Sequence, residues 1–80
     1  MTKIDELQNM VNESFGKDTV ILESNDNTVL VRYKKGDRTE YSVLRYNEKG
    51  CYGGRYYSTV NQSQETARES AWETYEQLTQ

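Results

Sequence analysis

Apolar side chains recur at helical spacing near both ends of the chain and alternate with polar ones between. Over residues 2–15, four apolar residues recur every three or four positions, which places them on one side of a helix. These residues are Ile4, Leu7, Val11 and Phe15. Thr2 is positioned to cap the start of this helix, and Gly16 follows its last apolar residue, where helices often end.

A second helix is predicted over residues 63–79. Its apolar side is formed by Ala67, Ala71, Tyr75 and Leu78, with Trp72 beside them. Asn61 or Ser63 is suited to cap its start. Because two of the four stripe residues are alanines, we expect the backbone of this helix to lie close to the surface that it covers.

Four strands are predicted between the helices, separated by short turns that contain Asn, Asp or Gly. They cover residues 19–24, 28–34, 38–46 and 51–60. Such short connections favour an antiparallel meander. The alternation fails at Val43-Leu44, which suggests a β-bulge, and Gly53-Gly54 indicates a bulge or a close backbone crossing.

These elements predict a single α+β domain over residues 1–80, with a four-stranded antiparallel meander sheet flanked by an N-terminal and a C-terminal helix. We expect both helices to pack on one face of the sheet, the face of Val29 and Val31. The other face would then be open. It would present Arg32, Lys34, Arg55 and Tyr57, joined by Arg45 or Tyr46 according to the position of the bulge.

The composition is polar for a folded chain, and its charge is unevenly distributed. Hydrophobic residues make up 34% of the sequence, below the roughly 45% of an average globular protein, so nearly all of them must point inward. Seven tyrosines and clustered β-branched residues argue against disorder. The net charge is −3, yet residues 27–60 carry seven basic and three acidic side chains, whereas the remainder carries three basic and ten acidic ones.

Several functional classes lack the residues that they need. The chain has no histidine and one cysteine, so a zinc cluster or a histidine-activated nucleophile cannot be assembled. We expect no enzyme activity, cofactor or metal, and we interpret Cys51 as a structural thiol. The unpaired cysteine and the absence of a signal-like or membrane-length apolar run predict a cytoplasmic protein with no membrane contact.

Two surfaces are candidates for protein contact. Four glutamates form a strip along the second predicted helix, namely Glu65, Glu69, Glu73 and Glu76, and this strip could face a basic groove. An ordinary solvated helix face is the alternative. The segment Tyr52-Gly-Gly-Arg55-Tyr-Tyr57 is the second candidate, because Tyr and Arg dominate binding hot spots.

The basic face of the predicted sheet is a candidate for direct nucleic-acid binding. Aromatic side chains stack on bases and cations follow phosphates. The residues with this chemistry are Arg32, Lys34, Arg45, Tyr46, Arg55 and Tyr57. A purely structural role for strand tyrosines and solubilising cations is the alternative.

Two known families share parts of this layout. The order of a helix, strands and a helix resembles a double-stranded-RNA-binding domain with an added strand. That family carries lysines at the start of its last helix, where residues 63–71 here carry acids, so the resemblance implies the layout without the phosphate contacts. The strands followed by Ala67, Ala71, Trp72 and Tyr75 are similar to the DNA-binding module at the front of phage-type integrases.

The sequence therefore favours a non-enzymatic protein-binding module. The hypothesis is a small accessory protein of the phage or mobile-element type that binds and inhibits or regulates a host protein, including one that itself handles nucleic acid. Direct nucleic-acid binding is the alternative. Either function is compatible with a monomer or with a dimer formed through a sheet edge.

Overall fold

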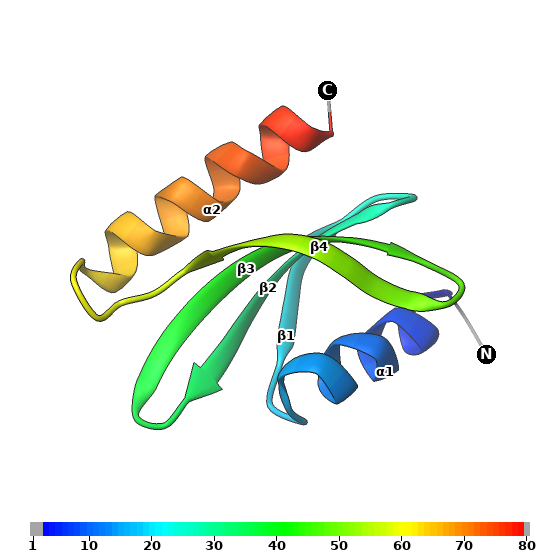
Figure 1. Ribbon diagram of the computed structural model, residues 1–80, viewed down its shortest axis with the longest axis horizontal. Coiled ribbons are helices and arrows are strands. Elements are labelled where there is room, and N and C mark those ends of the chain that lie inside the picture. The colour runs from blue at the N-terminus through cyan, green and yellow to red at the C-terminus, as the bar shows by residue number, and fades with distance from the viewer. Residues whose placement is uncertain (1–2, 80) are drawn as a thin grey trace.

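The chain forms one antiparallel sheet with a helix on each side (Figure 1). The structure, a computed structural model, describes residues 3–79, apart from the side chains of residues 3 and 4. The elements are α1 (Lys3–Phe15), β1 (Val20–Ser24), β2 (Thr28–Lys35), β3 (Arg38–Asn47), β4 (Gly50–Tyr57) and α2 (Gln64–Leu78). The strands lie side by side in chain order, which confirms the predicted α+β class and antiparallel meander.

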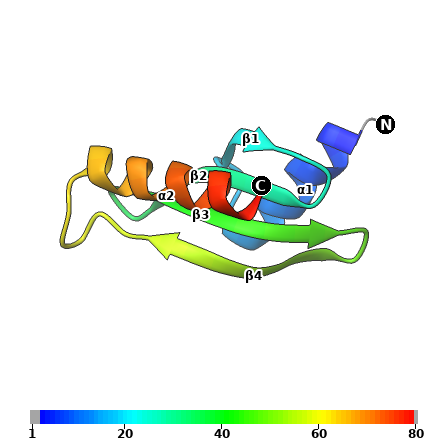
Figure 2. The ribbon, with the colours of Figure 1, turned by 90° about the horizontal axis from the view of Figure 1, so that it is seen from above.

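The prediction that both helices pack on one face is wrong. Val29 and Val31 of β2 are buried in a cluster with α1, whereas Leu30 between them is buried in a second cluster with α2. Successive strand residues point to opposite faces, so the helices cover opposite faces (Figures 1 and 2). The reason is visible in β2 and β3, whose continuous apolar runs put hydrophobic side chains on both faces, and each face then needs a cover.

Helix α1 covers its face with Leu7 and Val11, which are buried against β2 and Leu44 of β3. The predicted end at Gly16 is confirmed, because this glycine has a φ of 113° and its N–H donates to the Asn12 carbonyl (2.8 Å). The predicted cap, Thr2, lies outside the described residues, as does the side chain of Ile4.

Helix α2 approaches the opposite face closely, as its alanines predicted. Ala67 and Ala71 have no exposed surface and lie in one cluster with Leu30 and Val43. Of the two proposed caps, Ser63 is used: its Oγ accepts a hydrogen bond from the Thr66 N–H (3.1 Å). The start of α2 is therefore fixed by the cap at Ser63. The small side chains of the two alanines let the helix lie close to the sheet.

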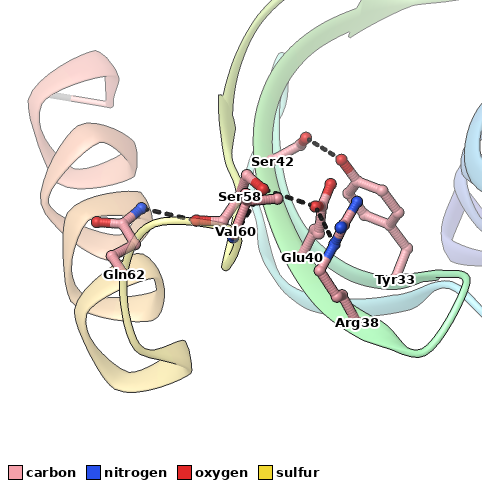
Figure 3. Close-up of polar contacts among 7 residues, drawn as sticks. All are labelled: Tyr33, Arg38, Glu40, Ser42, Ser58, Val60 and Gln62. Carbon is pink, nitrogen blue, oxygen red and sulfur yellow. Dashed lines mark hydrogen bonds and ion pairs between the residues drawn. The ribbon is translucent and has the colours of Figure 1, made fainter.

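Strand β4 ends earlier than predicted, at Tyr57 instead of residue 60, because side-chain contacts replace the ladder (Figure 3). Ser58 Oγ donates to the carboxylate of Glu40 in β3 (2.8 Å) and accepts from the Val60 N–H (3.1 Å). Glu40 is only 5% exposed and pairs with Arg38 (3.5 Å). These contacts hold the start of the β4–α2 connection against the sheet.

Neither helix within residues 3–79 is long and apolar enough to span a membrane.

Candidate functional site

The edge strand β4 carries two of the large hydrophobic side chains that are exposed in the described structure. Among the strands of residues 3–79 it has β3 as its one neighbour, so one side of its backbone is unpaired in the sheet. All five residues from 52 to 56 are exposed, and within this segment Tyr52 is 50% and Tyr56 is 63% exposed. We call residues 52–56 the β4 edge surface. Val60, in the connection that follows, adds a further apolar side chain that is 57% exposed.

A glycine bulge gives this surface its shape. Val43 pairs with Arg55 and Arg45 pairs with Tyr52, so two residues of β4 lie opposite Leu44 alone. These two are Gly53 and Gly54, with φ of 65° and 143°. The predicted irregularity at Val43-Leu44 is confirmed, and the extra residue is in β4.

The bulge also corrects the predicted faces of β4. Simple alternation placed Tyr52 opposite Arg55, but the extra residue brings both to the α2 face, where paired residues of adjacent strands point the same way. Arg45 joins them, which answers the choice left open between Arg45 and Tyr46. The side chain of Tyr46 is on the other face, packed against the α1 cluster, and its hydroxyl donates to the Asn25 carbonyl.

A pocket of about 170 Å³ opens beside the bulge. Arg45, Tyr52 and Arg55 line it together with the two glycines, and Val43 and Leu78 supply its apolar part. Arg38–Glu40 is the ion pair found among the described residues, so neither Arg45 nor Arg55 has an acidic partner there. The pocket thus combines two uncompensated cations, an exposed aromatic ring and an apolar wall.

Tyr56 extends the surface around the edge of the sheet to its α1 side. It pairs with Ser42, and its ring meets Phe15 edge-on at a centroid distance of 6.4 Å. Tyr56 lies within the segment from Tyr52 to Tyr57 that the sequence analysis gave as a contact candidate, but it was not among the residues named from that segment. The signal that could have found it is edge position, because a side chain on an edge strand has a neighbouring strand on one side only.

The predicted open basic sheet face does not exist as one surface. Helix α2 covers the middle of that face, over Leu30, Tyr41 and Val43. Arg32 lies at the level of Tyr41, within the β2–β3 ladder, whereas Arg45 lies at the level of Thr28, at one end of it. The exposed Arg32 and Lys34 are therefore separated along the strands from Arg45.

Tyr57 has a packing position. It is half-buried against the α2 cluster, and its hydroxyl forms a hydrogen bond with Thr74 of α2. Of the candidates expected to act together, the structure brings together Arg45, Tyr52 and Arg55, and leaves Arg32, Lys34, Tyr46 and Tyr57 elsewhere.

The acidic strip of α2 is present on the outer surface of that helix. Glu65, Glu69, Glu73 and Glu76 are all exposed. Arg68 is exposed on the same helix and places a positive charge among them. Glu65 of this strip lines a pocket near the start of α2 together with Tyr41, Gln64 and Arg68.

Cys51 begins β4 and is half-buried against the α1 cluster. Burial raises the pKa of its thiol, and a hydrogen bond with Ser14 opposes this shift in part. A thiol with a raised pKa is a weak nucleophile at neutral pH. Within residues 3–79, no three side chains of the metal-binding types group together.

Comparisons with protein-family models, with curated proteins and with solved structures find no match.

Proposed function

We propose that this protein is a non-catalytic protein-binding module whose contact is the β4 edge surface. The observation that carries the proposal is the exposure of five consecutive residues on an edge strand, with two tyrosines at least half exposed and an arginine between them. The chain is polar and its core is small, so folding alone would favour burying its large aromatic rings. Two such rings exposed on one strand indicate a contact surface.

The chemistry of this surface suits a protein partner. Tyr and Arg provide most of the energy in many interfaces, because they combine large contact area with hydrogen-bonding groups. An edge strand adds main-chain donors and acceptors that an extended segment of a partner is able to use. Gly53 and Gly54 of the bulge are exposed and carry no side chain, so their main chain is accessible to such a segment.

The proposed setting is that of a small accessory protein, of the kind made by phages and mobile elements, which binds a host protein and inhibits or regulates it. Small size and a charge split between a basic middle and acidic ends support this setting. A host protein that handles nucleic acid is one class of target, and the exposed glutamates of α2 supply a surface that could occupy a basic groove in it.

Paired variants separate the two surfaces. Wild-type protein, the double variant Tyr52→Ala/Tyr56→Ala and the double variant Glu69→Gln/Glu73→Gln are immobilised and exposed to a lysate of the native host at low salt. The proposal predicts that the wild type and the glutamine variant capture the same host protein and that the tyrosine variant does not. The affinity of the tyrosine variant should fall by about tenfold or more, because losing a hot-spot residue costs about 2 kcal/mol. Capture that depends on the glutamates alone, or no specific capture, would contradict it.

A further inference from the structure

The chemistry of the pocket beside the bulge indicates what kind of segment the partner presents. We propose that the pocket takes an acidic side chain from an extended segment of the partner protein, held between Arg45 and Arg55. This inference rests on the proposed function and adds to it the charge of the partner and the residues that recognise it.

The two arginines converge on the pocket from adjacent strands. Arg45 of β3 pairs with Tyr52, and Arg55 pairs with Val43, so both side chains belong to the same face, and both residues line the same pocket. Neither is neutralised by an acidic side chain among residues 3–79. Guanidinium groups are suited to bind a carboxylate through two parallel hydrogen bonds, a geometry that fixes the position of the acidic group.

The carbonyl end of α2 lies beside the pocket and must be counted against this positive charge. Leu78, the last residue of α2, lines the pocket, and the last turn of α2 contains no basic residue of its own. The end of a helix carries the equivalent of roughly half a negative charge. Two full positive charges exceed it, so the pocket remains positive and attracts an anion.

The other walls favour a peptide over a free anion. Val43 and Leu78 present apolar surface, which can cover the carbon stem of an acidic side chain. Tyr52 offers an exposed ring, and the unpaired side of β4 offers main-chain hydrogen bonds to an extended backbone. Free phosphate or a nucleic-acid strand would use the arginines but not the strand edge.

The protein's own acids are placed so that they do not fill the pocket. The glutamates of α2 face solvent and none of them lines it. Thr74, through which α2 contacts Tyr57 of β4, is uncharged. The positive pocket is thus left for a group supplied from outside.

The test is a fluorescence-anisotropy titration with three labelled probes: an alternating Thr-Glu dodecapeptide, the matching Thr-Lys dodecapeptide and a dodecamer of thymidylate. The proteins are wild type, Arg45→Gln/Arg55→Gln, and Arg32→Gln/Lys34→Gln, which removes the same charge from exposed residues of β2. Circular dichroism and urea unfolding confirm that the variants are folded. We expect the Thr-Glu peptide to bind the wild-type protein most tightly of the three probes. Its affinity should fall by about tenfold in the Arg45→Gln/Arg55→Gln variant and change little in the Arg32→Gln/Lys34→Gln variant.

Each other outcome overturns the inference in a distinct way. Equal weakening in both variants would indicate non-specific attraction to net charge. Tighter binding of thymidylate that depends on Arg45 and Arg55 would assign the pocket to nucleic acid. Absence of binding to every probe would remove the acidic-segment inference and leave the proposed function standing, provided that the host protein is still captured through Tyr52 and Tyr56.

Discussion

Gly54 is the residue on which the shape of the β4 edge surface depends most. Its φ of 143° belongs to a region that other residues rarely adopt, and a Cβ at this position would lie 2.9 Å from Cδ2 of the buried Leu44. Both effects act where the bulge turns Arg55 toward the pocket. A side chain at position 54 would therefore disturb the core and the proposed site together.

Gly54→Ala is expected to lower the free energy of unfolding by about 2–3 kcal/mol, because backbone strain and overpacking add. Gly36→Ala is the matched control: its φ of 65° is also positive, but no atom lies within 4 Å of the added Cβ. The control should lose only about 1 kcal/mol, from backbone strain alone. Urea denaturation measures both, and equal losses would show that the contact with Leu44 is unimportant.

Cys51 is expected to react slowly with iodoacetamide in the folded protein. Burial raises the pKa of its thiol, so near pH 8.5 less thiolate is present in the folded than in the unfolded chain. The difference in reaction rate between the folded and the unfolded chain should therefore narrow as the pH rises. The folded state holds the thiol proton more tightly than the unfolded state does. The protonated Cys51 therefore stabilises the fold at pH values below its pKa in the unfolded chain, and this stabilisation is lost as the pH rises through its pKa in the folded protein.

The control for this prediction is Ser14→Ala. The hydrogen bond with Ser14 lowers the thiol pKa, so removing it should slow alkylation further at the same pH. The rates are measured by mass spectrometry in buffer and in urea. Alkylation as fast in the folded as in the unfolded protein would contradict the assignment of Cys51 as a protonated packing residue.

At the scale of elements, the helices and strands could be predicted from spacing, but their arrangement could not be predicted fully. Helical periodicity and short turns were enough for the element order and the meander. The wrong part of the prediction concerns the faces of the sheet. Val29 and Val31 predict one buried face, and the polar residues near Leu30 predict an open face opposite, but Leu30 is apolar and is itself buried under α2. A single strand has too few residues to show whether both helices cover one face of the sheet or each helix covers a different face.

The start of α2 depends on Ser63, whose Oγ accepts from the Thr66 N–H. Ser63→Ala is expected to lower the free energy of unfolding by about 1 kcal/mol, because a helix N–H loses its partner. Ser63→Asn keeps an acceptor in the same place and should remain close to wild type. Thermal unfolding followed by circular dichroism compares them, and equal losses in the two variants would show that the cap is not stabilising.

At the scale of the whole molecule, the candidate site could be predicted only in part. Residue type identified Tyr52 and Arg55 as contact candidates, since tyrosine and arginine dominate binding hot spots. Grouping them with Arg45 needed the bulge, and separating them from Arg32 needed the position of α2. The local sequence predicts a bulge but does not show which residues it brings to one face, and the position of α2 depends on packing between segments far apart in the sequence.

The central claim, that the β4 edge surface is the working surface, is tested most directly by site-specific photo-crosslinking. Benzoylphenylalanine is placed at position 56 in one sample and at position 69, on the acidic strip of α2, in another, and each is irradiated in a lysate of the native host. The account predicts a discrete crosslinked protein from position 56 and none from position 69. A discrete crosslink from position 69 alone would contradict it and assign binding to the acidic helix.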